Sequence, residues 1–212
     1  MKRILPLLLL SLPAACAAPR IAVNPRADFS AVKRVAVLPF GGAKGELAAD
    51  LLTQSLLARG ADVVERQRLA SVMQEQSLSS SGSFDPAAAR QLGRLLGVDA
   101  LFTGTVAEST PPGAYLVSSS NAPLATGVAD VSGGSIRVEG SFPGLPNTRL
   151  LSTAANVSLV SRMVDVETGS ILWSASMTYE GFDIPSAMTA ITDSFIRSLD
   201  PIWPALYRYG SK

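Results

Sequence analysis

Few side chains in this 212-residue chain could carry out covalent or acid–base chemistry. The chain contains no histidine and only one cysteine, Cys16. Catalytic groups that need a histidine base and metal sites built on imidazole are therefore excluded, and a single thiol cannot form a thiolate cluster. We expect no enzymatic activity and no cofactor, and Cys16 is the residue with the clearest chemical assignment.

Three further patterns could carry chemistry, and each has a simpler explanation. Asp165 and Glu167 flank a turn, whereas a glycosidase pair must face a cleft at about 5–9.5 Å separation. Residues 41–45 (GGAKG) follow a predicted strand but lack the Gly-Lys-Ser/Thr order and the Rossmann spacing of phosphate loops. Glu65 and Arg66, at a strand-to-helix junction, are typical of a cap or an ion pair. We expect all three to be structural.

Residues 1–15 have the pattern of a secretory signal peptide. Lys2 and Arg3 precede an apolar run over residues 4–12, which small residues follow. The run is too short to span a bilayer as a stable helix. The sequence therefore predicts export from the cytoplasm.

Two cleavage sites remain open. Residues 15–17 (ACA) fit the small-x-small rule of ordinary signal peptidase, which would release a periplasmic protein. Residues 14–16 (AAC) resemble a bacterial lipobox, which would make Cys16 the lipid attachment site, although Pro13 stands where an aliphatic residue is usual. An unpaired thiol is unusual in an oxidising compartment, and acylation removes it, so we favour the lipoprotein. Ala17 in place of aspartate then implies the outer membrane.

The charge balance argues against nucleic-acid binding. Without Lys2 and Arg3 the chain carries 16 basic and 17 acidic residues, and it has no basic stripe that could neutralise phosphates. Charged residues make up only 17% of the chain. We therefore expect the surface to be partly covered by a partner or by copies of the same chain.

The rest of the chain predicts one α/β domain over residues 34–200. Residues 16–33 contain two prolines and few core-forming side chains, which is typical of a linker. The domain alternates strands and helices in its first half, an order that places helices on a sheet. We expect strands at 34–40, 62–65, 99–106, 156–166 and 170–180, with Trp173 in the core, and helices at 46–59, 66–76, 87–96 and 185–199.

Two segments have no clear pattern. Residues 111–153 are rich in Gly, Ser, Pro and Asn and alternate weakly, which predicts a long loop or a hairpin ordered by a partner. The tail, residues 201–212, carries Trp203, Tyr207 and Tyr209. These aromatic residues could dock a partner or the membrane interface.

Four stretches together resemble the CsgG family, named for the curli-secretion channel of the bacterial outer membrane. They are residues 34–40 (RVAVLPF), 63–69 (VVERQRL) leading to 74–76 (QEQ), 97–101 (GVDAL), and 159–173 with its VDVETG turn. Related periplasmic domains include the amino-terminal domain of TolB and the lipoproteins that activate penicillin-binding proteins. The resemblance implies a compact α/β domain with a mixed sheet, a lipid-anchored amino terminus and often ring-forming oligomers.

The sequence therefore predicts a non-enzymatic outer-membrane lipoprotein that faces the periplasm. We expect it to assemble as a homo-oligomeric ring or docking platform for a secretion, polymer-export or peptidoglycan machine. The alternative is a curli-type secretion pore, in which residues 114–152 add one hairpin to a shared outer-membrane barrel. A second hairpin has no room after Tyr179. A periplasmic hydrolase is disfavoured because no nucleophile–base set is present.

Overall fold

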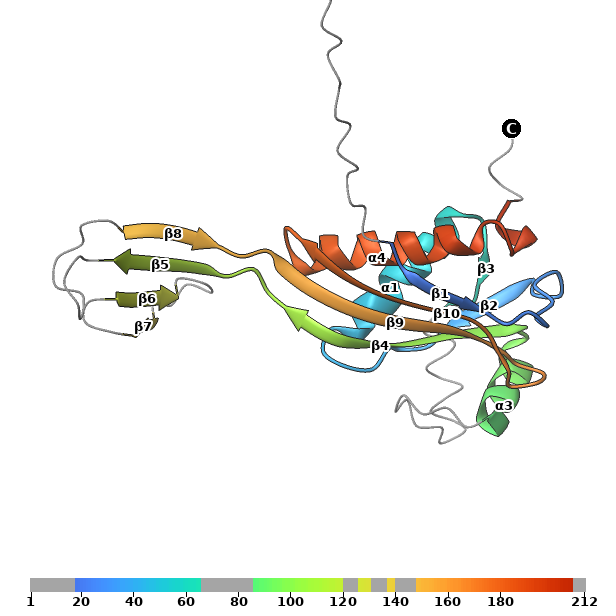
Figure 1. Cartoon of the computed structure of the whole chain (residues 1–212). Helices are drawn as coiled ribbons and strands as arrows, with labels where there is room; N and C mark the ends of the chain where they lie inside the picture. Colours follow the sequence, from blue (N-terminus) through green and yellow to red (C-terminus); the bar gives the residue numbers. More distant parts are fainter. Residues whose placement is uncertain (1–17, 66–85, 120–125, 131–136, 140–147, 208–212) are drawn as a thin grey trace, which may run out of the picture.

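A six-stranded mixed sheet forms the centre of the molecule (Figure 1). The computed structural model describes residues 18–65, 86–119, 126–130, 137–139 and 148–207. The strand order is β1-β10-β9-β4-β2-β3, in which β2 is parallel to β3 and β4 and the other neighbours are antiparallel. The strands are β1 (Arg20–Val23), β2 (Arg34–Val37), β3 (Asp62–Val63), β4 (Ala100–Thr110), β9 (Ala155–Asp165) and β10 (Ile171–Gly181).

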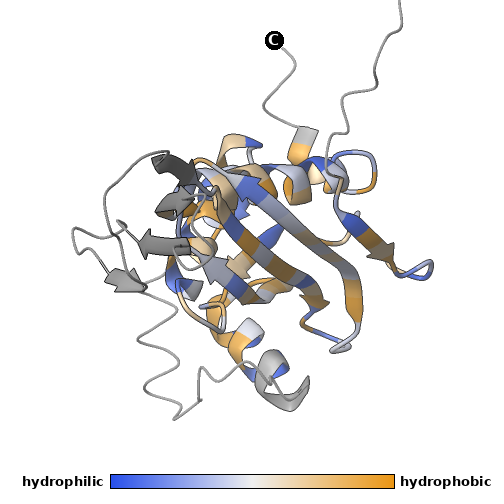
Figure 2. Cartoon of the chain, turned by 60° about the vertical axis from the view of Figure 1, so that its left-hand side comes forward, coloured by the Kyte–Doolittle hydropathy of each residue, from blue (hydrophilic) through white to orange (hydrophobic). Residues whose placement is uncertain are grey.

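Helices cover both faces of this sheet. Helices α1 (Gly45–Ala58) and α4 (Ile184–Leu199) lie on one face, and α3 (Pro86–Leu96) lies on the other (Figure 1). Buried and more exposed side chains alternate along β9 and β10, which appear as hydrophobic and hydrophilic bands in Figure 2. The α/β class with a mixed sheet, predicted from the alternation of strands and helices, is confirmed.

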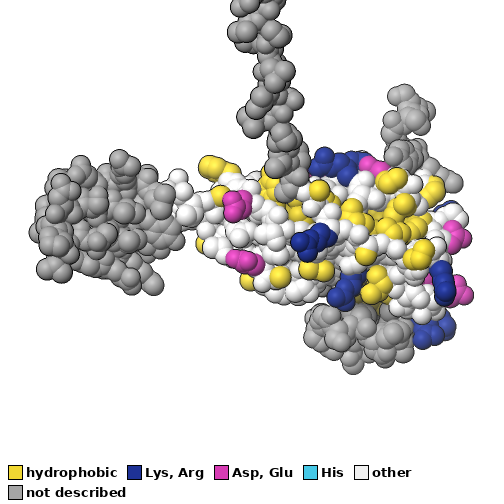
Figure 3. Space-filling model, viewed as in Figure 1, with side chains coloured by type: hydrophobic (Ala, Val, Ile, Leu, Met, Phe, Trp, Pro, Cys, Tyr) yellow, Lys and Arg dark blue, Asp and Glu magenta, His cyan; other side chains and the backbone are white. Residues whose placement is uncertain are grey.

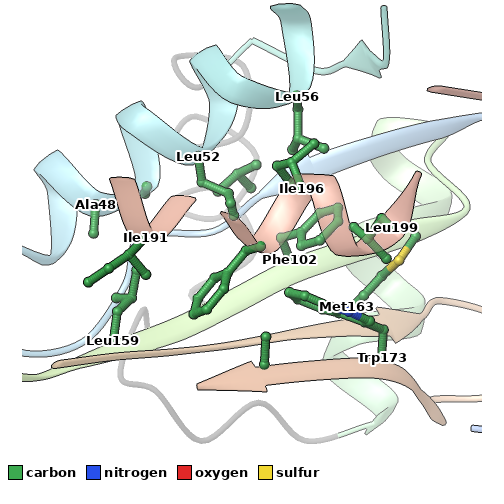
Figure 4. Close-up of a cluster of buried hydrophobic side chains, with 14 of the residues drawn as sticks. Ala48, Leu52, Leu56, Phe102, Leu159, Met163, Trp173, Ile191, Ile196 and Leu199 are labelled. Carbon is green, nitrogen blue, oxygen red and sulfur yellow. The ribbon is translucent and has the colours of Figure 1, made fainter. Parts of the chain in front are cut away.

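The larger core lies between the sheet and helices α1 and α4 (Figure 4). Trp173 is fully buried there, as predicted, and its ring meets Phe102 and Phe195 edge-on with centroids 6.2 and 5.8 Å apart. Its Nε1 donates to Ser198 Oγ at 3.1 Å, so the polar atom of this large side chain is satisfied. The labelled core residues are Ala48, Leu52, Leu56, Phe102, Leu159, Met163, Trp173, Ile191, Ile196 and Leu199.

The element boundaries follow the sequence pattern closely. The predicted helices at 46–59, 87–96 and 185–199 correspond to α1, α3 and α4, and all five predicted strands are present. β4 runs four residues beyond its predicted end at Val106. The predicted helix at 66–76 lies outside the described residues.

The prediction that residues 16–33 form a linker is wrong from Arg20 onward. β1 pairs with β10, from Arg20 opposite Ser176 to Val23 opposite Trp173, and forms one edge of the sheet. Phe29 and Val32 are buried in the larger core. The sequence of β1 did not predict a strand, because the strand has only four residues and all of them are exposed, so buried and exposed positions do not alternate. The domain therefore begins by Arg20.

The tail is also part of the core. A 3₁₀ helix, η2 (Pro204–Tyr207), follows Trp203, which is 0% exposed, and Leu206 is buried beside it. Trp203 Nε1 donates to the Val32 carbonyl oxygen at 3.0 Å. The expectation that Trp203 docks a partner or the membrane is therefore wrong. Tyr209 lies outside the described residues.

The insertion forms a second sheet instead of a loop or a single hairpin. This antiparallel sheet has the order β7-β6-β5-β8 and projects from the end of β4 and β9 (Figure 1). Its strands are β5 (Ala114–Ser119), β6 (Thr126–Asp130), β7 (Arg137–Glu139) and β8 (Thr148–Ser152). These strands are only three to six residues long, and such short segments do not show the apolar alternation that would have predicted them from the sequence.

The GGAKG segment is a tight connection between β2 and α1, as expected. Gly42 has φ +88°, and a Cβ atom there would stand 2.2 Å from the carbonyl oxygen of Val106. A Cβ on Gly45 would stand 1.9 Å from the carbonyl oxygen of Phe40. Only glycine fits these contacts, because backbone atoms close off the space. Steric fit therefore explains these glycines without a phosphate ligand.

The start of α4 carries a titratable cap. The Asp183 side chain accepts a hydrogen bond from Ser186 N at 2.8 Å, and Ser186 Oγ accepts one from Asp183 N at 3.1 Å, which together form a capping box. Hydrogen bonding by Ser186, first through its side chain and then through its backbone N–H, lowers the pKa of Asp183 from 3.8. The charged carboxylate is therefore the form that stabilises the folded state.

This cap predicts an acid-sensitive contribution to stability. A lowered folded-state pKa contributes stability above the unfolded value of 3.8, and the contribution is lost as the pH falls through the folded value. We expect the advantage of wild type over Asp183→Ala in urea unfolding to shrink between about pH 6 and about pH 3. Glu167→Ala, which changes an exposed acid in a turn, serves as the control. An advantage that does not change with pH would contradict the prediction.

Candidate interaction surfaces

The predicted lipid attachment site, Cys16, lies outside the described residues, which begin at Ala18. Ala18 and Pro19 line a groove beside the edge strand β1.

Asp165, which the sequence singled out, and Asp99, which it did not, hold neighbouring backbone in place. Asp165 Oδ1 accepts hydrogen bonds from Thr168 N at 2.6 Å and Thr168 Oγ1 at 2.7 Å, which closes the turn between β9 and β10. Glu167 is exposed beside it. Asp99 Oδ2 accepts from the backbone N–H groups of Lys33 and Arg34 at 2.7 and 2.9 Å. Asp165 and Asp99 therefore have structural roles: Asp165 closes a turn, and Asp99 binds the backbone at the start of β2.

These carboxylates also line a hollow in the surface together with an arginine side chain. Asp99, Asp165 and Glu167 line a hollow of about 600 Å³ together with Arg94 of α3. Within the described part of the chain, no group of three or more acidic, histidine or cysteine side chains is placed to hold a metal ion. Two of the three acids are engaged with backbone or hydroxyl donors, so we assign this hollow no chemistry.

An apolar groove runs between β1, β10 and α4. Its volume is about 970 Å³, and its walls include Ile21 of β1, Met177 and Tyr179 of β10, and Ala190 of α4. Ile21 is 43% exposed although it sits opposite Ala175 on the face that α4 covers elsewhere. Hydrophobic side chains gather on the surface where Figure 1 draws β1 (Figure 3). Helix α4 thus leaves this edge of the sheet open.

Phe182 is the most exposed large apolar side chain among the described residues, at 90%. It stands in the turn between β10 and α4, directly before the cap residue Asp183. The turn also borders a hollow of about 690 Å³ formed with Pro112, Gly113 and Ala154 at the base of the second sheet. Phe182 therefore lies where the main domain meets the projecting sheet.

Sequence reasoning missed both the groove and Phe182. The groove is formed by segments some 150 residues apart in the chain, and β1 has no periodic pattern from which it could have been predicted. Phe182 left a weak signal, because a hydrophobic residue just before a helix cap usually packs on the fourth helical residue. Here that residue is the small Ala187, which is buried against Gly181. The side chain of Phe182 stays exposed instead.

The helices of the described residues do not have the features of membrane-spanning helices. None of the helices there is both long enough and apolar enough to pass through a bilayer.

The comparisons with known proteins agree with the α/β domain described above. The family model of the curli production assembly/transport component CsgG matches residues 7–109. This match confirms the family resemblance predicted from the sequence, and it extends back into the apolar run before Cys16. The family is described as one of assembly and transport components. No curated protein sequence matches the chain.

Several solved structures are distantly similar. A PelC dodecamer from Paraburkholderia phytofirmans is 17% identical, with 89% of this chain and 98% of that chain covered, at a TM-score of 0.45. Lipoprotein GNA1162 from Neisseria meningitidis is 16% identical, with 79% and 97% covered, at 0.45. The LpoB C-terminal domain from Escherichia coli is 17% identical, with 72% and 87% covered, at 0.41. These values are too low to transfer an oligomeric state or a function.

Proposed function

We propose that this protein is a lipid-anchored, non-enzymatic component of the bacterial envelope that assembles into an oligomer. It would sit on the periplasmic face of the outer membrane, attached through Cys16, and serve as a docking platform for a secretion, polymer-export or peptidoglycan machine. The observation that carries the proposal is the family match over residues 7–109, which joins the apolar leader to the first half of the α/β domain.

The projecting sheet supports a docking role. β4 leads into β5 and β8 leads into β9, so two long strands of the main sheet continue into the second sheet (Figure 1). Thr153 N donates to the Gly113 carbonyl oxygen at 2.8 Å, and Gly113 N donates to Thr153 Oγ1 at 2.9 Å. These hydrogen bonds tie the two chain crossings together. An arm held in this way can present a binding surface away from the core.

The second candidate is a curli-type pore subunit, favoured by the antiparallel strands found within residues 114–152. A strand that crosses an outer membrane needs about 9–11 residues. β5 has 6 residues, β6 and β8 have 5 each, and β7 has 3. Each is shorter than a crossing strand, so we favour the platform over the pore.

Extraction in mild detergent separates the two candidates. We expect discrete oligomers of the extracted protein by mass measurement, and no conductance when it is added to planar bilayers. A variant in which a short turn replaces residues 114–152 is the matched comparison, since Gly113 and Thr153 are already paired. This variant should keep the number of subunits in the oligomer and lose crosslinks to envelope proteins. Wild-type conductance that disappears on this deletion would establish the pore, and a monomeric wild type would contradict the platform.

A further inference from the structure

We infer that Phe182 of one copy inserts into the groove between β1, β10 and α4 of a second copy. The inference deepens the proposed oligomer and rests on it, because it names the two surfaces that meet. Phe182 is apolar, the groove has a mixed lining with more apolar than polar surface, and both are uncovered in the single chain. Phe182 cannot fill the groove of its own copy in this structure, because 90% of its surface is exposed.

The backbone on both sides of Phe182 is held in place. The capping box fixes Asp183 and Ser186 on one side of it. On the other side, a Cβ atom on Gly181 would stand 2.9 Å from Ala187, so β10 and α4 approach each other closely there. An aromatic side chain on a preorganised turn loses little conformational entropy on binding. Such residues are typical interface anchors.

The groove has the size and lining that such an anchor needs. Its volume of about 970 Å³ lies within the usual range for binding pockets, about 300–1,000 Å³. Ile21, Met177, Tyr179 and Ala190 contribute apolar surface. Ile21 is close to half exposed, so a second copy would remove both its side chain and Phe182 from water.

The charges beside the two surfaces are complementary. Asp183 follows Phe182 directly, and its carboxylate stays ionised because Ser186 lowers its pKa. Arg197 lines the groove, where its guanidinium donates to the Asp193 carbonyl oxygen and to Ser194 Oγ of its own helix. In the part of the chain that the structure describes, no carboxylate pairs with it. A second copy can therefore place Asp183 near Arg197 as Phe182 enters. Glu180 also lines the groove and opposes this attraction in part.

The contact joins different patches of two identical chains. Each chain carries one Phe182 and one groove, so the contact can close either as a two-fold pair or as a ring. Both arrangements bury Phe182 in the groove, and the mass of the oligomer distinguishes them.

Crosslinking between two variants, each with one introduced cysteine in addition to Cys16, tests the contact. The full-length lipoprotein is made as Phe182→Cys and as Ile21→Cys, and the two are mixed in mild detergent and oxidised. We expect a disulfide-linked dimer in the mixture and little in either variant alone. Leu57→Cys, at a leucine of α1 that is 55% exposed, replaces Ile21→Cys as the matched control and should give no more than background.

Loss of the anchor provides the second measurement. Phe182→Ser should weaken self-association at least about tenfold, since one buried aromatic anchor commonly carries that much of an interface. Leu57→Ser should leave the mass distribution unchanged, and the thermal unfolding of both variants shows that they are folded.

If wild type is oligomeric but Phe182→Ser associates normally and no mixed disulfide forms, the inference fails and the proposed oligomer stands. If wild type is monomeric, both fail. If Phe182→Ser reduces only binding to lipid vesicles, Phe182 contacts the membrane and the inference is overturned.

Discussion

Replacing Trp203 with alanine is expected to lower the free energy of unfolding by about 3–5 kcal/mol, which is the usual cost of truncating a fully buried tryptophan. Trp203 is 0% exposed, and its ring lies 6.2 Å from that of Phe102 between centroids. The change would leave a cavity beside Phe102 and would remove the donor to the Val32 carbonyl oxygen. Both the tail and the segment before β2 would lose their main attachment to the core.

Urea unfolding monitored by circular dichroism measures this effect. Trp203→Phe keeps an aromatic ring in the core but removes the hydrogen bond and part of the buried volume, so it should cost less than Trp203→Ala. Leu57→Ala, which truncates an exposed leucine, should change the free energy of unfolding by no more than about 0.5 kcal/mol. If Trp203→Ala unfolds at the same urea concentration as Leu57→Ala, the tail does not contribute to the core.

Replacing Cys16 with alanine is expected to move the protein from the membrane pellet to the soluble periplasmic fraction. The thiol is the only group in the proposed lipobox that can take a lipid, and each buried methylene of an acyl chain contributes about 0.8 kcal/mol to membrane binding. Alanine at this position keeps a run of small residues, so ordinary signal peptidase should still release the exported chain. The variant tests anchoring separately from export.

Fractionation after a high-salt wash, combined with labelled palmitate, provides the measurement. Wild type should pellet and carry the label, and Cys16→Ala should do neither. Ala17→Ser, at the adjacent residue, keeps the thiol and should behave as wild type does. Pelleting of an unlabelled Cys16→Ala protein would show that another surface holds it at the membrane, and a wild type without label would exclude lipidation.

Much of the main domain could be predicted because its signals are local. The β9–β10 hairpin combines two alternating runs with a Glu-Thr-Gly turn, in which Gly169 adopts φ +72° and Asp165 closes the loop. The helix α1 shows a leucine stripe and ends before Gly60, which has φ +78°. Periods of two and of about four residues, with glycine where φ is positive, identify such elements without knowledge of their neighbours.

The segments that were misjudged depend on distant neighbours. β1 is a strand because β10, some 150 residues away, offers a free edge for pairing. Trp203 is buried because it packs in the core against Phe102, and Val32, 171 residues away in the chain, accepts its hydrogen bond. The projecting sheet forms from short strands whose residues carry no clear alternation. None of these three features can be recognised from the residues close by in the sequence. Composition alone therefore predicted a linker, a loop and a free aromatic tail.

The amino-acid sequence alone was enough to predict the α/β class and the order of the main elements, and it shows directly that the chain has no histidine and one thiol after an apolar leader. These properties depend on residue identity and on spacing within one element. Packing between distant segments sets the rest: the tail joins the core, β1 completes one edge of the sheet, an apolar groove remains open beside α4, and Phe182 stands exposed on a rigid turn. Such features arise where segments from both ends of the chain meet, because burial is set by packing between elements and not by the pattern within one of them.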